Sequence, residues 1–235
     1  MNKSRLDKFL ASALSLGKRD VKVLLAQKKV HVDDNVINDG AYQINKFSQI
    51  KVNGTSLQNQ QPAYIMLNKP IGVVSATKDN IHKTVLDLLT DPEKSDLHIV
   101  GRLDLNTSGL LLLTNDSRWS ERLTLPESKV PKTYQVTLQN KLTSDYIDAF
   151  QQGMYFEFED IITQPADLTL VSDYVAQVIL MEGKYHQIKR MFGRFRNPVV
   201  KLHRSQIGAL LLDDTLKAGQ SRHLTISEVD NIFNL

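Results

Sequence analysis

The chain has 235 residues, of which 41% are hydrophobic and 23% are charged, and its formal net charge is +3. This balance is ordinary for a globular protein of one or two domains. The absence of cysteine excludes disulfides, thiol catalysis and cysteine-ligated metal centres, and the six histidines show no spacing typical of a metal site. No apolar run reaches the roughly 18 residues of a membrane-spanning helix, so we expect a cytoplasmic protein that binds neither metal nor membrane.

Positive charge is concentrated in two segments. Residues 1–60 contain ten Lys and Arg against five Asp and Glu, and residues 184–204 contain seven Lys and Arg and no acid. Residues 61–235 as a whole contain nineteen Lys and Arg against twenty-one Asp and Glu, so the second basic segment lies within a nearly neutral part of the chain. Two separate basic segments predict a polyanionic partner that is contacted at two places.

The N-terminal segment is predicted to form a small basic module. Apolar spacing predicts helices over 4–16 and 19–29, and alternation predicts a strand, turn and strand over 30–37. The run Arg5-Leu6-Asp7-Lys8-Phe9-Leu10-Ala11, the basic helix after it and the Val-x-Val-Asp turn resemble an S4 RNA-binding domain. The resemblance implies such a domain over 1–58, with RNA contacts from Arg5, Lys8, Lys18, Arg19 and Lys22.

A polar, uncharged stretch over 59–62 is the predicted linker, and residues 63–235 form the predicted second domain. In chain order we expect a strand from Tyr64, a Lys-Pro-x-Gly turn, a second strand ending at Ser75, and a short helix over 84–90. Further helices are expected over 118–123, 144–153, 185–195 and 227–233, and strands over 132–138, within 154–180, and over 199–202 and 207–212. Strands dominate without a regular βαβ alternation, so the predicted fold class is α+β.

An acid and a base stand two residues apart in an otherwise apolar or small-residue segment. If the chain is extended there, Arg102 and Asp104 share one face, Thr107 to Gly109 form a turn, and the four leucines from Leu110 form a strand buried on both faces. The pair is then either a structural ion pair or a carboxylate with a chemical task.

Four motifs occur in a fixed order, and each alone has an ordinary structural explanation. They are Asn68-Lys69-Pro70-x-Gly72, Gly101-Arg102-Leu103-Asp104-x-x-Thr107-x-Gly109-Leu110, Lys132-Thr133-Tyr134, and Gly183-Lys184-Tyr185-His186-Gln187-Ile188-Lys189-Arg190-Met191. Together they resemble the RsuA branch of the bacterial ribosomal pseudouridine synthases. That branch joins an S4 domain to a catalytic domain built on a mixed, mainly antiparallel β-sheet flanked by helices.

The resemblance implies isomerisation of uridine to pseudouridine in ribosomal RNA without metal or cofactor. Asp104 takes the essential carboxylate role, either attacking the anomeric carbon or removing a ribose proton, and Lys189 pairs with it and keeps it ionised. Tyr134 stacks on the uracil, and Arg102 helps to extrude the nucleotide. Further RNA contacts are expected from Lys69, His186, Gln187, Arg190 and Arg204.

The target is expected to be uridine 516 of 16S ribosomal RNA in an assembling small subunit, modified by a monomer. The runs Ser75-Ala76-Thr77 and Arg118-Trp119-Ser120 resemble the small-subunit branch. Sister enzymes acting on 23S ribosomal RNA and a non-catalytic S4-type assembly factor are the alternatives. Hydrolysis of a glycosidic bond would need a second acid near Asp104, and Asp116 is the nearby candidate.

Overall fold

The computed structural model describes residues 3–90 and 94–234. The chain divides between Pro62 and Ala63 into two compact units. Among the described residues, no helix is both long and apolar enough to cross a membrane.

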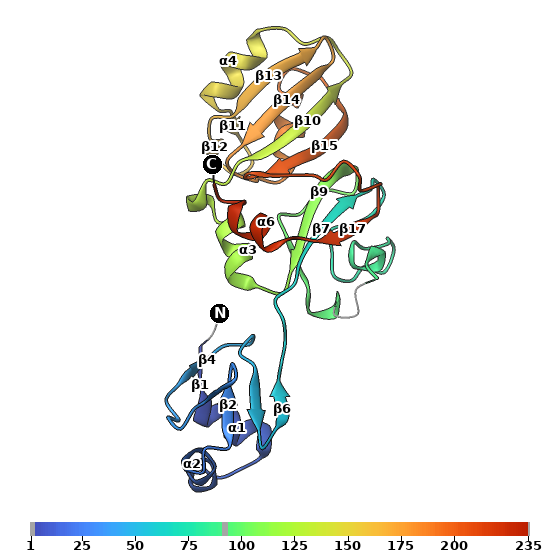
Figure 1. The fold of residues 1–235 in the computed structure, drawn as a ribbon. Coiled ribbons are helices and arrows are strands. Elements are labelled where there is room, and N and C mark those ends of the chain that lie inside the picture. The colour runs from blue at the N-terminus through green and yellow to red at the C-terminus, as the bar shows by residue number, and fades with distance from the viewer. Residues whose placement is uncertain (1–2, 91–93, 235) are drawn as a thin grey trace. The chain divides into compact units, whose positions relative to one another are not determined.

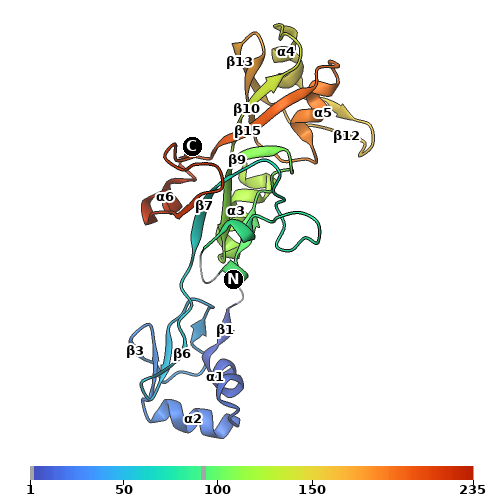
Figure 2. The same ribbon diagram turned by 90° about the vertical axis from the view of Figure 1, so that its right-hand side faces the viewer.

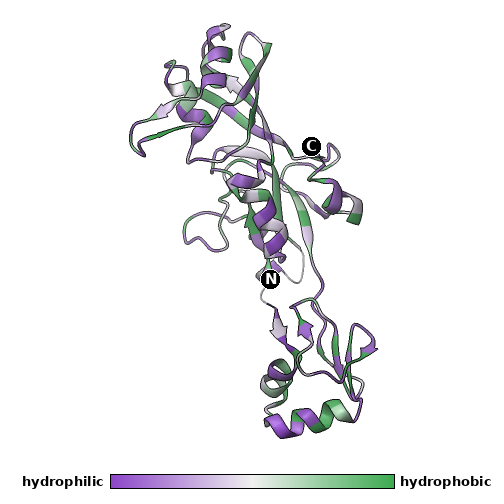
Figure 3. Ribbon diagram, turned by 90° about the vertical axis from the view of Figure 1, so that its left-hand side faces the viewer, coloured by the Kyte–Doolittle hydropathy of each residue, from purple (hydrophilic) through white to green (hydrophobic). Residues whose placement is uncertain are grey.

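The N-terminal unit packs two helices against short strands (Figure 1). Its core combines Leu6 and Leu10 of the first helix and Val21 and Leu25 of the second with strand residues such as Val30. This spacing of four residues puts each pair on one helix face. Hydrophilic and hydrophobic residues alternate along α2 (Figure 3). The elements are β1 Ser4–Arg5, α1 Leu6–Leu14, α2 Lys18–Ala26, β2 Val30–Val32, β3 Asn35–Val36, β4 Gln43–Ile44, β5 Ile50–Val52 and β6 Thr55–Gln58.

Both N-terminal helices are shorter than predicted. The first begins at Leu6, because Arg5 lies in the short strand β1 paired with Gln43. It ends before Ser15, whose left-handed backbone (φ 54°) closes the last turn. Gly17 precedes α2 instead of ending α1.

The C-terminal unit is built on a nine-stranded sheet. Seven of its strands follow the order β13-β14-β10-β15-β9-β7-β17, and the other two, β16 and β8, pair with β15 and β9. Within the described residues, every ladder of this sheet is antiparallel except β9 with β15. Its strands are β7 Tyr64–Lys69, β8 His98–Val100, β9 Thr107–Thr114, β10 Lys132–Leu138, β13 Asp167–Ser172, β14 Val175–Leu180, β15 Val199–Ile207, β16 Leu210–Leu211 and β17 Ser221–His223. The α+β class is confirmed.

The remaining elements of this unit cover or edge the sheet. They are the helices α3 Ser117–Thr124, α4 Asp145–Gln152, α5 Gln187–Gly193 and α6 Ile226–Asn231, the 3₁₀ turns at Leu86–Leu88, Lys94–Asp96 and Pro126–Ser128, and the two-residue strands β11 Tyr155–Phe156 and β12 Ile161–Ile162. Helices α4 and α5 lie beside β10 and β15 (Figure 2). Their aromatic side chains pack together in one core cluster with residues of β10, β14 and β15.

Strand β9 is buried on both faces, as its leucine run predicts. Leu111 and Leu113 pack with Leu103 and the segment that contains Val85, whereas Leu110 and Leu112 pack with Trp119 of α3 on the other face. All four leucines are fully buried. This strand therefore gives the neighbouring loop a rigid base.

Two local predictions are wrong. The second strand ending at Ser75 does not form, because that segment makes only an isolated bridge between Val74 and Thr84. The turn predicted over Thr107 to Gly109 lies earlier, at residues 105–106, and Thr107 already belongs to β9.

Candidate active site

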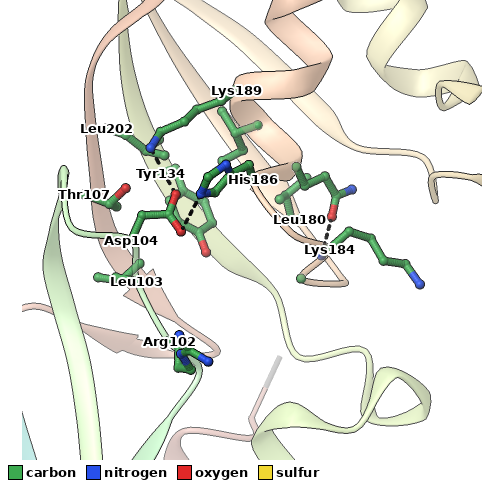
Figure 4. Close-up of a pocket in the computed structure, with 13 residues that line it drawn as sticks. Arg102, Leu103, Asp104, Thr107, Tyr134, Leu180, Lys184, His186, Lys189 and Leu202 are labelled. Atoms are coloured by element: carbon green, nitrogen blue, oxygen red, sulfur yellow. Dashed lines mark hydrogen bonds and ion pairs between the residues drawn. The ribbon is translucent and has the colours of Figure 1, made fainter. Parts of the chain in front are cut away.

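A cleft of about 100 Å³ opens beside the loop that precedes β9. Asp104 on that loop, Tyr134 on β10 and the Gly183–Lys189 segment line it (Figure 4). These residues come from three of the four motifs, so the fold gathers into one place segments that are distant in the sequence.

The Asp104 carboxylate has a partner on each oxygen. Lys189 Nζ lies 3.0 Å from Oδ2, and His186 Nε2 lies 3.4 Å from Oδ1. Lys189 is 85 residues along the chain from Asp104. The proximity of Asp104 and Lys189 expected from the sequence is therefore present.

The loop that carries Asp104 is held from below by Lys69. Its Nζ donates to the carbonyl oxygens of Pro70 at 3.0 Å, Asp104 at 3.0 Å and Thr107 at 2.8 Å, and the side chain is fully buried. Burial lowers the pKa of Lys69 to about 8, an effect that the nearby Asp104 carboxylate opposes. The predicted RNA contact of Lys69 is wrong, because no face of this ammonium is available to a phosphate.

Arg204 of β15 holds the same loop from the other side. Its Nε donates to the Leu110 carbonyl at 2.8 Å, and its guanidinium donates to the Gly101 carbonyl at 2.7 Å and to the Tyr134 hydroxyl at 3.4 Å. Only 2% of Arg204 is exposed, so its predicted role as an RNA contact is also wrong.

Two small residues complete this support. Ser75 Oγ accepts from the Leu103 N–H at 3.1 Å and donates to the Leu103 carbonyl at 2.7 Å. Gly109 pairs with Arg204 in the parallel ladder, where its φ is +108° and a Cβ would lie 2.2 Å from the Arg204 carbonyl oxygen. Only glycine permits this approach of β9 to β15.

Two further predicted RNA contacts have structural partners. Gln187 is buried, accepts from the Lys184 N–H and donates to Glu182. Arg190 makes a bidentate pair with Glu159 at 2.6 and 2.7 Å, which connects α5 to the segment between β11 and β12. Gln187 is thus engaged inside the protein, whereas the RNA contact of the partly exposed Arg190 stays a prediction; neither pairing was visible in the sequence.

Arg102 does not share a face with Asp104. The segment between them is not a regular strand, and Arg102 is exposed and lies apart from the Asp104, Lys189 and His186 group (Figure 4). It makes no hydrogen bond or ion pair within the described part of the chain. The ring of Tyr134, by contrast, lies beside Asp104 (Figure 4).

Asp116 is not a second acid of this site. It lies beyond the far end of β9, where its carboxylate accepts from the Arg118 and Trp119 amides and caps α3. Its Oδ2 also accepts from the Tyr64 hydroxyl at 2.9 Å. The paired-carboxylate alternative thus loses its candidate acid.

Three residues that the sequence did not single out also belong to the site. Ser75 was noted only as the end of a strand and as part of the Ser75-Ala76-Thr77 run, and Lys132 and Lys184 only as members of motifs. The two lysines line a hollow that adjoins the cleft. Lys132 and Lys184 each stand two residues before a predicted site residue, Tyr134 and His186, and this spacing could have identified them from the sequence.

A second candidate site lies within the N-terminal unit. A hollow of about 730 Å³ separates α1 and α2 from the 38–41 loop, and Arg5, Lys8, Lys18 and Lys22 all line it. Arg5 is paired with Asp7 at 2.6 Å. Arg19 is exposed on α2 but does not line the hollow. Of the five residues predicted to contact RNA in the N-terminal unit, four therefore line one hollow.

Comparison with known proteins places the chain in a class of RNA-modifying isomerases. Residues 63–193 match the RNA pseudouridylate synthase family. The "Ribosomal small subunit pseudouridine synthase A" of Pseudomonas aeruginosa is 46% identical over 97% of this chain and 100% of the relative. The protein of the same name from Escherichia coli is 38% identical over 97% of this chain and 99% of the relative.

A solved structure described as a pseudouridylate synthase agrees with these relatives. It is 37% identical, covers 97% of this chain and 99% of its own, and superposes with a TM-score of 0.71. The chain belongs to the RNA pseudouridylate synthase family and is an enzyme of the isomerase class.

Proposed function

We propose that this pseudouridine synthase acts on small-subunit ribosomal RNA and that Asp104 is its catalytic carboxylate. The observation that carries the proposal is the Asp104 carboxylate itself, paired with Lys189 at 3.0 Å in a cleft that Tyr134 also lines. The names of the two relatives, both small-subunit enzymes, support the choice of substrate.

The reaction needs one reactive carboxylate, and the site must retain the detached uracil. The N1–C1′ bond of uridine breaks, the uracil turns, C5 bonds to C1′, and the proton on C5 leaves while N1 gains one, so the product is an isomer. Asp104 acts at the ribose, either as a nucleophile at C1′ or as the base that removes a ribose proton. Lys189 pairs with the carboxylate and orients it, and Tyr134 packs against the uracil and lies close to the carbon that loses its proton.

Access to the uridine requires that the base leave its stack, at a cost of a few kcal/mol. Arg102 is exposed at the rim of the cleft, where a guanidinium can hold the extruded nucleotide or its backbone. Contacts of the basic N-terminal unit with phosphate offset part of this cost.

The N-terminal unit is proposed to be an S4-type RNA-binding domain, connected to the catalytic domain by residues 59–62. Its support is the cationic hollow between α1, α2 and the 38–41 loop, together with the exposed Arg19. Deleting residues 1–62 is expected to raise the RNA concentration for half-maximal rate at least about tenfold and to change the rate at saturating RNA much less. Equal activity of the truncated enzyme at low RNA would contradict this role.

Substituting Asp104→Asn tests the catalytic assignment. Loss of the ionised carboxylate is expected to lower pseudouridine formation by at least about a thousandfold while RNA binding changes by less than about threefold. Asp173→Asn, an exposed carboxylate paired with Lys141, is the matched control. Pseudouridine formed by the Asp104→Asn enzyme at an undiminished rate would refute the assignment.

The proposed target is uridine 516 of 16S ribosomal RNA in an assembling small subunit, with a cytoplasmic monomer as the acting species. The motif resemblance to the small-subunit branch supports this position. Pseudouridine mapping in ribosomal RNA from cells with and without the gene tests it. Loss of a site in 23S ribosomal RNA would instead assign the chain to the sister branch.

A further inference from the structure

A larger hollow of about 560 Å³ adjoins the Asp104 cleft and shares residues with it. Arg102, Asp104, Tyr134 and His186 line both spaces, and the hollow extends to Lys132 and to the segment after α3. The nucleotides before and after an extruded uridine have to lie beside the cleft, because the RNA backbone connects them to it. This hollow is therefore positioned to receive the neighbouring part of the substrate.

Four cationic side chains and two acidic ones line the hollow, but most of them already have protein partners. Asp104 is paired with Lys189, and Glu182 accepts from the Gln164 N–H and from Gln187 and lies 3.8 Å from Lys184. Arg204 donates to backbone carbonyls, as described above. Within the part of the chain that the structure describes, two of these cations have no side-chain hydrogen bond or ion pair at all, and these are Arg102 and Lys132.

Lys132 is not an ordinary surface lysine. It is partly buried at the start of β10, and its side chain makes no hydrogen bond or ion pair with any residue that the structure describes. Burial, together with the nearby Arg204 guanidinium, lowers the pKa of Lys132 to about 8. A half-buried ammonium without a counter-ion is costly, and an anion placed against it would repay part of that cost.

The strand directs Lys132 toward the site. Lys132, Thr133 and Tyr134 pair without a break with Leu180, Ile179 and Val178 of β14. The ladder with β15 shifts register between Thr133 and Tyr134, but the extra residue lies on β15, so β10 itself continues as a strand through these residues. Side chains two residues apart on a regular strand point to the same face, about 6.5 Å apart along the strand. Lys132 and Tyr134 therefore lie on the same face of β10, and both line the hollow. Thr133 between them is buried on the opposite face.

We propose that Lys132 and Arg102 form a phosphate subsite that binds the RNA backbone next to the target uridine. The proposal rests on the proposed function, because it assigns the ligand as a phosphodiester of the same RNA substrate. Lysine supplies a point charge and arginine a planar pair of donors, and phosphate oxygens accept from both. This subsite would hold the backbone while the base occupies the Asp104 cleft.

Salt-dependent binding of Lys132 variants tests the subsite. The probe is a synthetic small-subunit ribosomal RNA fragment that contains the mapped target uridine, measured with the full-length protein. Lys132→Gln is expected to raise both Kd and KM about tenfold, and to lower the slope of log K against log salt by about 0.7 to 0.9, the contribution of one phosphate contact. Lys132→Arg, which keeps the charge, is expected to restore most of the affinity.

A scan of uncharged linkages locates the phosphate. Replacing single phosphodiesters near the target uridine by methylphosphonates is expected to weaken wild-type binding about tenfold at one position. The same replacement is expected to cost the Lys132→Gln protein little, because the contact is already absent. Lys141→Gln, an exposed lysine beyond the other end of β10, is the control and is expected to keep the wild-type pattern.

Additive losses from the linkage and from Lys132→Gln, or an unchanged salt slope, would overturn the subsite. Melting temperatures of both Lys132 variants separate a folding defect from a lost contact. The proposed function is tested independently, since wild-type protein that binds the fragment without forming pseudouridine would contradict the function. Wild-type protein that forms pseudouridine while Lys132→Gln binds normally would contradict the subsite alone.

Discussion

The cations expected to bind RNA behave differently in the two units of the molecule. In the N-terminal unit, Lys8, Lys18 and Lys22 are exposed along one hollow, and their side chains make no hydrogen bond or ion pair with another residue that the structure describes. In the C-terminal unit, Lys69 and Arg204 are buried and donate to backbone carbonyls. The same residue types thus serve as surface charge in one unit and as internal cross-links in the other.

This difference changes how a basic motif is to be interpreted. A lysine or arginine in a nucleic-acid enzyme can act on the substrate directly, or it can fix the loop that carries the reactive group. The second role predicts losses of stability on substitution, and the first predicts losses of affinity with a change in salt dependence. The predictions below separate these two roles.

The largest effect is expected for Gly109→Ala, where β9 approaches β15. A Cβ would lie 2.2 Å from the Arg204 carbonyl oxygen at a φ of +108°, so either the ladder must separate or the backbone must change. We expect a loss of about 4 kcal/mol in the free energy of unfolding, measured by urea denaturation. Gly54→Ala is the control, since it has a positive φ of 80° with no atom within 4 Å, and should cost only about 1 kcal/mol.

Lys69→Met should cost about 3 kcal/mol, because three carbonyl groups lose their donor inside the protein. Denaturant unfolding measures this loss, and pseudouridine formation is expected to fall with it as the Asp104 loop loosens. Lys22→Met in the N-terminal unit should change stability by less than about 0.5 kcal/mol. An equally stable Lys69→Met protein would remove the distinction drawn between the two units.

The double substitution Lys18→Gln and Lys22→Gln is expected to act on affinity instead. Loss of two exposed charges at the hollow should weaken RNA binding about tenfold and reduce the salt slope, with no measurable change in melting temperature. Lys29→Gln, an exposed lysine that does not line the hollow, provides the control. Unchanged binding by the double variant would move the RNA contact of this unit elsewhere.

The smallest effect is expected at Arg222, which bridges Asp213 and Glu228 near the C-terminus at 2.6 and 2.7 Å. Hydrogen bonds, above all from Thr215 and Arg222, lower the pKa of Asp213 to about 2, and those from Arg222 lower that of Glu228 to about 2. A depressed carboxyl pKa adds stability that is present above the unfolded value near 4 and is lost as pH falls toward 2. Arg222→Met should therefore lower the melting temperature by about 2 °C at pH 6 and by less at pH 2.5.

Sequence patterning predicted those parts of the fold that local composition decides. The leucine run before Thr114 is buried on both faces of β9, and glycine after Gln152 ends α4, as expected. The strand predicted to end at Ser75 does not form, because the segment makes only the isolated bridge to Thr84, and the Ser75 hydroxyl binds the Leu103 backbone. Alternation of side chains cannot reveal a partner that lies 28 residues away.

Some residues of the site could likewise be predicted from the sequence, and others could not. Asp104 and Lys189 were matched through the family's motifs, and their contact follows from a fold that no spacing in the sequence specifies. Lys69 was misassigned because a lysine before proline gives no sign of whether its ammonium faces solvent or three carbonyl groups. Lys132 was overlooked because its significance comes from burial and from the absence of an acid beside it, both of which are tertiary properties.

The parallel ladder between β9 and β15 also bears on when the enzyme becomes active during its synthesis. Lys69 precedes the loop that carries Asp104, but Arg204 contacts carbonyl groups of residues that precede it by 94 and 103 positions. The support of this loop is therefore incomplete until most of the chain has left the ribosome. Contacts of such long sequence separation form late in folding. The nascent chain therefore gains its catalytic loop only near completion, and fragments that end before β15 should be inactive.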